Sequence, residues 1–63
     1  EEDACLPLVE MALGVEYAAY DLYRTLADNS SDAGVKDAFM QLAQAEKAHM
    51  EALTKTIDLC NPT

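Results

Sequence analysis

Apolar residues recur every three or four positions along the first part of the chain, where they form two adjacent stripes. The first stripe contains Leu8, Ala12, Val15, Ala19, Leu22 and Leu26, and the second contains Val9, Leu13, Glu16, Tyr20, Tyr23 and Ala27. This spacing places the members of each stripe on one face of an α-helix. A single neighbouring helix covers one stripe, so two stripes predict two neighbours for this helix.

The second part of the chain has one broad apolar face with the same period. Its members are Val35, Phe39, Leu42, Glu46, His49, Leu53, Ile57 and Cys60, widened by Ala38, Ala45, Met50 and Ala52. Most charged and amide side chains of this segment fall on the opposite side. The pattern predicts a second amphipathic helix.

Helix-breaking residues cluster between these two segments, at residues 28–32. Asn29 favours the left-handed conformation that often ends a helix. A side-chain oxygen of Ser30, Ser31 or Asp32 is suited to cap the helix that follows. The pattern therefore predicts one tight reversal of the chain at this point.

Two prolines help to place the outer ends of the helices. Pro7 lies in the first turn of the first segment, where a missing N–H costs little, and Pro62 follows the second segment. We expect helices at about 4–28 and 32–59, within one domain that spans residues 1–63. The predicted fold class is all-α, with the two helices packed as an antiparallel hairpin.

An isolated hairpin of 63 residues would leave much of its apolar surface in water. A domain of this size buries only about 60% of the surface that its unfolded chain exposes. We therefore expect a homodimer in which two hairpins form a four-helix bundle. The alternative is that this hairpin packs against the rest of a longer protein.

The charge of the chain narrows the choice of partners. Four basic and 12 acidic residues give a net charge of −8. This charge argues against binding to nucleic acid or to an anionic membrane. No apolar run approaches the length of a membrane-spanning helix, and no signal peptide is visible. We expect neither partner, and a location in the cytoplasm.

Three polar side chains lie on the otherwise apolar stripes: Glu16, Glu46 and His49. Such groups are costly to bury without partners. In an antiparallel hairpin, two residues that lie side by side on the two helices are equally far from the turn. The mean of their residue numbers therefore falls in the turn. Glu16 pairs with Glu46 about position 31 and with His49 about position 32.5, and both midpoints fall inside or next to the predicted turn. We expect the three side chains to meet.

Two carboxylates and one imidazole make half of the ligand set of a di-iron carboxylate site in a helical bundle. A two-fold axis would supply the other half, giving a set suited to two iron ions, or to manganese, and poorly suited to zinc. The alternative is that Glu16 and Glu46 reach out to water from the edges of their stripes, with His49 a hydrogen-bonded interior histidine.

Cys5 and Cys60 also pair about position 32.5. The matching register predicts a disulfide within one chain, at the end opposite the turn. A pair of free thiols buried side by side is the alternative.

The residues of the proposed site resemble one half-repeat of the rubrerythrin-like branch of the ferritin-like superfamily. The matching motifs are Glu16-x6-Tyr23 and Phe39-x2-Leu42-Ala43-x2-Glu46-x2-His49. The length of the hairpin is similar to that of encapsulated ferritins, in which two hairpins build one iron site. The resemblance implies that Glu46 bridges both irons. It also implies that Glu16 and His49 are terminal ligands and that Tyr23 donates a hydrogen bond to a ligating carboxylate.

The resemblance further implies a ferroxidase, which oxidises ferrous iron with oxygen or hydrogen peroxide. The assembly would be a homodimer holding two irons, within a larger assembly or a protein compartment in some relatives. One alternative is a rubrerythrin-like peroxide reductase. Since the chain has no C-x-x-C motif for a rubredoxin centre, its electrons would come from another protein. The other alternative is a non-enzymatic helical module for protein interaction or metal binding.

Overall fold

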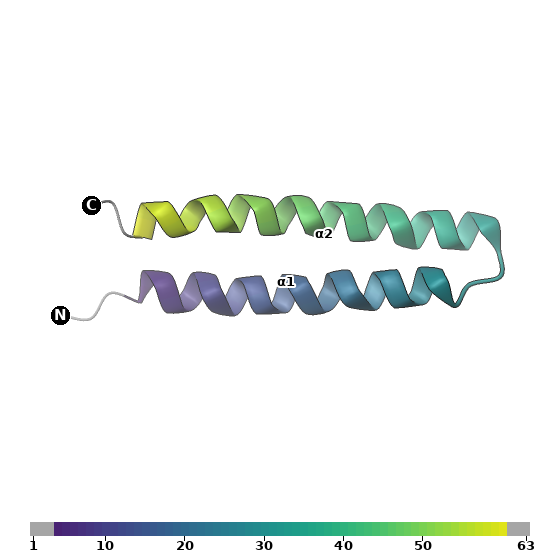
Figure 1. Ribbon diagram of the computed structural model, residues 1–63, viewed down its shortest axis with the longest axis horizontal. Helices are drawn as coiled ribbons and strands as arrows, with labels where there is room; N and C mark the ends of the chain where they lie inside the picture. Colours follow the sequence, from purple (N-terminus) through teal and green to yellow (C-terminus); the bar gives the residue numbers. More distant parts are fainter. Residues whose placement is uncertain (1–3, 61–63) are drawn as a thin grey trace.

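The computed structural model describes residues 4–60, which form two long antiparallel helices. Helix α1 runs over Cys5–Asp28 and helix α2 over Ala33–Cys60. They lie side by side along their whole length and make a rod of 52 × 15 × 10 Å (Figure 1). The all-α hairpin predicted from the sequence is confirmed, with each predicted helix boundary within one residue of the observed one.

The turn between the helices differs from the prediction at Asn29. This residue has a φ of −95° and a ψ of 0°, so its backbone is right-handed, and no described residue, glycine included, has a positive φ. Its backbone N–H and its side-chain Nδ2 both donate to the carbonyl oxygen of Thr25, at 3.1 and 2.9 Å. The amide side chain thus satisfies a terminal carbonyl, which removes the need for a left-handed residue.

Of the three candidate caps for the second helix, the structure selects Asp32. Its Oδ1 accepts a hydrogen bond from the N–H of Val35 at 3.0 Å, the geometry of a helix N-cap. Its carbonyl oxygen accepts from the N–H of Lys36 and from the hydroxyl of Ser30. These contacts fix the point at which α2 begins, and therefore the register between the helices.

The interface between the helices is thin. Only Val9, Ala27 and Ala43 are buried among the described residues. The rings of Tyr23 and Phe39 stack with their centroids 6.4 Å apart. Because Ala27 and Ala43 have no exposed surface, their small side chains allow the helices to approach closely on the turn side of the molecule.

The large side chains of the first stripe of α1 lie open to solvent, while its Ala12 and Ala19 are half-buried. With Met11 and two residues of α2, these large side chains make up the set that we call the apolar face: Leu8, Met11, Val15, Leu22, Leu26, Val35 and Leu42, all exposed. Leu8, Met11 and Val15 of this face also line a groove whose other side is formed by His49, Ala52 and Leu53 of α2. Large exposed apolar surfaces of this kind mark interaction sites.

A disulfide joins Cys5 to Cys60, the first residue of α1 and the last of α2. The predicted pairing is therefore confirmed. The hairpin is closed by the turn at one end and by the disulfide at the other. Within the described residues, neither helix combines the length and the hydropathy needed to cross a membrane.

Candidate metal centre

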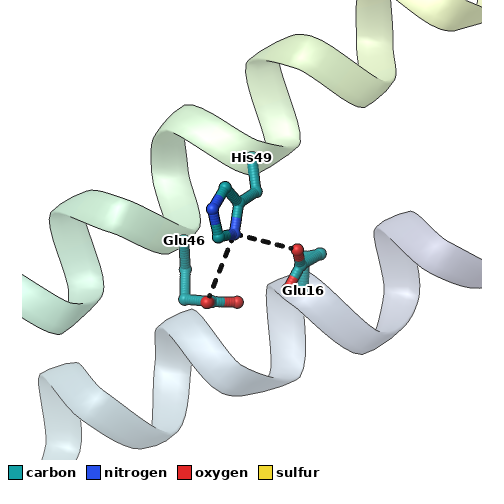
Figure 2. Close-up of side chains that lie close together, drawn as sticks. All are labelled: Glu16, Glu46 and His49. Carbon is teal, nitrogen blue, oxygen red and sulfur yellow. Dashed lines mark ion pairs between the residues drawn. The ribbon is translucent and has the colours of Figure 1, made fainter.

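The structure brings Glu16 of α1 together with Glu46 and His49 of α2 (Figure 2). His49 Nδ1 lies 3.2 Å from Glu16 Oε2 and 3.5 Å from Glu46 Oε1. One ligand atom from each residue lies within 4.8 Å of the other two. Glu46 and His49 are one helical turn apart, so they share a face of α2, and the register set by the turn places Glu16 opposite them.

The three side chains differ in their exposure to solvent. The Glu46 side chain is 15% exposed, the Glu16 side chain 24% and the His49 side chain 59%. Glu46 follows the fully buried Ala43 by one turn, which explains why its carboxylate lies deepest. The cluster therefore runs from the helix interface at Glu46 to the surface at His49.

When both carboxyl groups are ionised, one oxygen of Glu46 has no hydrogen-bond donor. Its Oε2 is buried and accepts no hydrogen bond from any described residue. A buried polar atom without a partner costs free energy, and such atoms are rare in native proteins. A cation bound beside Glu46 would supply the missing contact.

The electrostatics of the cluster favour a proton or a cation on Glu46. The pKa of Glu46 is raised above its ordinary value, first by a hydrogen bond to the carboxyl group of Glu16. Lost hydration and repulsion by the Glu16 charge raise this pKa further, while His49 acts in the opposite direction. Two carboxyl groups this close do not both ionise easily without a positive charge between them.

An open groove of about 680 Å³ leads along the apolar face to the cluster. Glu16 and His49 line it together with Leu8, Met11, Ala12, Val15, Ala52 and Leu53. The imidazole of His49 is therefore reachable from solvent or from a second molecule lying in the groove.

The structure gives the nearby tyrosines other contacts than a carboxylate. The ring of Tyr23 stacks on Phe39, and its hydroxyl donates to neither Glu16 nor Glu46 within the described part of the hairpin. The predicted contact of Tyr23 with a ligating carboxylate stays a prediction. The hydroxyl of Tyr20 accepts a hydrogen bond from Arg24 at 2.8 Å. This pair was not predicted, although their spacing of four residues signals it.

The donor set fits iron or manganese. Carboxylate oxygens and an imidazole nitrogen suit these ions, and the unpartnered oxygen of Glu46 offers a free ligand atom. Three protein ligands are too few to hold two ions, so a two-ion site would need ligands from outside this cluster.

A family model described as Rubrerythrin matches residues 8–63 of the chain. A search of curated proteins and a search of solved structures gave no match. The family match includes Glu16, Glu46 and His49 and covers nearly the whole chain. The chain therefore belongs to the rubrerythrin family of the ferritin-like superfamily.

Proposed function

We propose that this protein is a di-iron carboxylate ferroxidase whose metal site is completed by a second copy of the chain. The observation that carries the proposal is the buried, unpartnered Oε2 of Glu46 beside Glu16 and His49. In a chain of the rubrerythrin family, this free carboxylate oxygen supports a ligand role over a purely structural one.

The positions of the ligand atoms support different roles for the three residues. Glu46 has one oxygen near His49 Nδ1 and a second oxygen without a partner, which suits a carboxylate that contacts two ions. Glu16 and His49, at the outer side of the cluster, are suited to hold one ion each. The carboxyl groups of Glu16 and Glu46 favour a shared proton when no metal is bound. Binding of a cation would release this proton, because the metal ion replaces it as the positive charge between the two groups. The bound iron pair would supply the electron transfer to oxygen or peroxide.

A homodimer is supported by the apolar face and by the incomplete ligand set. Docking of a second hairpin on this face would bury its Leu and Val side chains and form a four-helix bundle. The exposed imidazole of His49 lies in the groove on that same side. A two-fold axis there would bring two copies of each ligand to one height and hold two iron ions, or manganese, per dimer. Growth into a larger assembly is compatible with this arrangement.

The source of electrons favours the ferroxidase function over the peroxide reductase function. The two cysteines of the chain are joined to each other at the end of the rod, and no second redox centre is formed by the described residues. A peroxide reductase would thus need electrons from a redox centre that the described residues do not provide. In a ferroxidase the substrate iron itself is the reductant.

The charge and the disulfide of the chain bear on its partners and its location. The net charge of −8 suits attraction of cations and opposes binding to nucleic acid or anionic membranes. The expected cytoplasmic location, free or inside a protein compartment, stays a prediction. The disulfide favours an oxidising environment, since such bonds are rare in a reducing cytosol.

Addition of ferrous iron without oxygen, followed by air, tests the proposal. We expect two irons per dimer by elemental analysis and a rise in ferric absorbance that is faster than in buffer. Glu46→Ala should lose both signals, because each substitution removes a ligand twice per dimer. Glu51→Ala is the matched control, since Glu51 is exposed on the same helix.

Two outcomes would contradict the proposal. If Glu46→Ala still binds two irons per dimer and oxidises them at the parental rate, the di-iron assignment is wrong. If the parent binds no iron and remains helical, the chain is better described as a non-enzymatic interaction module.

A further inference from the structure

Large and small side chains are distributed unevenly along the apolar face. Near the turn, four large side chains of this face are exposed: Leu22, Leu26, Val35 and Leu42. Near the disulfide, Leu8, Met11 and Val15 of the face line the groove together with the smaller Ala12 and Ala52. Each hairpin therefore has exposed apolar side chains toward one end of the rod and an apolar groove toward the other.

On α1, the residues of the first apolar stripe are arranged symmetrically about position 17. Ala12 and Leu22 lie five residues to either side of this position, and Val15 and Ala19 lie two residues to either side. If a two-fold axis at position 17 relates two antiparallel copies of α1, each residue meets the residue at the mirrored position of the other copy. Leu22 then lies against the partner's Ala12, and Val15 against the partner's Ala19, so each contact joins a larger side chain to a smaller one.

Helix α2 has the same arrangement about position 47. Leu42 and Ala52 lie five residues to either side of this position, and Ala45 and His49 lie two residues to either side. A two-fold axis at position 47 brings Leu42 against the partner's Ala52. In both helices, the larger residue of the wider pair lies toward the turn, and the alanine of that pair lines the groove.

The two symmetry positions lie at the height of the metal cluster. The mean of 17 and 47 is 32, which falls between the means of 31 and 32.5 that relate Glu16 to Glu46 and to His49. Positions 17 and 47 therefore lie side by side across the hairpin. The midpoints of α1 and α2, at 16.5 and 46.5 from their first and last residues, lie there as well. One two-fold axis perpendicular to the rod can thus bring the two clusters together and pair the apolar faces along the whole length of the rod.

We propose that the turn half of a second copy fills the groove, in a dimer whose two rods run antiparallel. The two-fold axis passes through the metal cluster, so α1 packs on the partner's α1 and α2 packs on the partner's α2. Leu22 and Leu42 of each copy lie in the groove of the other, next to the partner's Ala12 and the partner's Ala52. This inference rests on the proposed function, which requires a second copy and leaves the direction of its rod open. The same contact covers the exposed imidazole of His49.

A dimer with parallel rods would pair these side chains poorly. Its two-fold axis runs along the rods, so α1 packs on the partner's α2. The register of the hairpin then places Leu22 opposite the partner's Leu42, large against large, and places one groove opposite the other. Overfilled and empty regions both destabilise a packed interior, because protein interiors are close-packed and contain few voids. The antiparallel dimer avoids both.

Energy transfer between two dyes distinguishes the two arrangements. The native cysteines are bonded to each other, so Ser31→Cys in the turn adds one reactive thiol per chain. Chains labelled with a donor are mixed with chains labelled with an acceptor, loaded with manganese and purified as the dimer. The dye pair is chosen so that its transfer distance is about half of the 52 Å length of the rod. A dimer that carries only the donor, with the same metal, is the reference.

Gln44→Cys is the matched control, because Gln44 is exposed on α2 close to the height of the metal cluster. We expect near-zero transfer between labels at position 31, since the two turns lie about one rod length apart, and strong transfer between labels at position 44. Strong transfer at position 31 would overturn the antiparallel arrangement while the proposed dimer stands. Near-zero transfer at both positions would show that the two clusters do not meet, and would overturn the proposed dimer as well. A protein that yields no dimer with manganese has the same consequence.

Discussion

The carboxyl group of Glu46 lies in two different surroundings. One oxygen lies 3.5 Å from His49 Nδ1, and the other is buried without a partner. In the absence of metal, a hydrogen bond that the protonated carboxyl group can share with Glu16 raises the pKa of Glu46. The same atoms that would bind a cation are therefore a source of instability when no cation is present.

The raised pKa of Glu46 predicts a pH dependence of the metal-free protein. Below pH 4.5, the pKa of an unperturbed glutamate, Glu46 is protonated in both the folded and the unfolded chain, and its full contribution to the stability of the fold is present. As the pH rises through the raised pKa of the folded state, this contribution is lost. We expect Glu46→Gln to melt above the parent at neutral pH, and this difference to shrink toward pH 4.5. Thermal melts in the presence of a chelator measure it. If the difference in melting temperature between Glu46→Gln and the parent does not change with pH, it does not come from the raised pKa of Glu46.

A second prediction at the residue scale concerns Tyr23. The ring stacks on Phe39, and among the described residues its hydroxyl donates to neither Glu16 nor Glu46. Tyr23→Phe should keep this stack and the bound metal, with a stability change below about 1 kcal/mol. We expect a changed rate of iron oxidation if the hydroxyl meets a ligating carboxylate in the dimer. An unchanged rate at full metal loading would remove Tyr23 from the site.

The two helices begin in different ways. A side-chain oxygen of Asp32 caps α2, while the residue at the same position of α1 is Ala4, whose side chain makes no cap hydrogen bond. The start of α2 sets which residues face each other across the hairpin, since every later pairing follows from it. The cap at Asp32 therefore helps to place Glu46 and His49 opposite Glu16.

Removal of this cap measures its contribution to the free energy of unfolding. Asp32→Ala should lower the free energy of unfolding by about 1 kcal/mol, the usual value for an N-cap. Asp32→Asn is the control, because an amide oxygen caps a helix nearly as well. Urea denaturation of both variants gives the comparison. Equal losses for both would show that the charge of Asp32, and not the cap, is what matters.

At the scale of the whole molecule, a slender rod carries an uncovered apolar face. Leu22 is 54% exposed in the hairpin, and its neighbours on the face are exposed as well. In the single hairpin these side chains contribute little to stability. In a four-helix bundle they would form the core.

Leu22→Glu should therefore separate folding from assembly. We expect the variant to keep its helices and to sediment as a monomer, since a charge in the interior of a bundle is costly to bury. Gln44→Glu adds the same charge at an exposed position of α2 and should leave the dimer intact. A dimeric Leu22→Glu would show that another surface is used.

Much of this molecule could be predicted from its sequence, because local rules and global register agree. The apolar period fixed the helices, and the turn at residues 28–32 placed Glu16 opposite Glu46 and His49. The conformation of Asn29 could not be predicted in this way. Either its amide side chain or a left-handed backbone can satisfy the terminal carbonyl group of the helix, and the sequence does not show which one does. The hydroxyl contact of Tyr20 depends on the side-chain rotamers of Tyr20 and Arg24, which a helical period does not specify. The contact of Tyr23 with a carboxylate stays a prediction.

The closure of the hairpin by the disulfide has a mechanical consequence. The Cα atoms of Cys5 and Cys60 are 5.6 Å apart, so a pull applied to the chain on the outer sides of these two residues passes through the S–S bond. The helices and the metal cluster between them carry none of that load. In a single-molecule pulling experiment the oxidised hairpin should resist extension until the covalent bond is reduced. The reduced hairpin should unzip from the open end and should lose the cluster before it loses the turn.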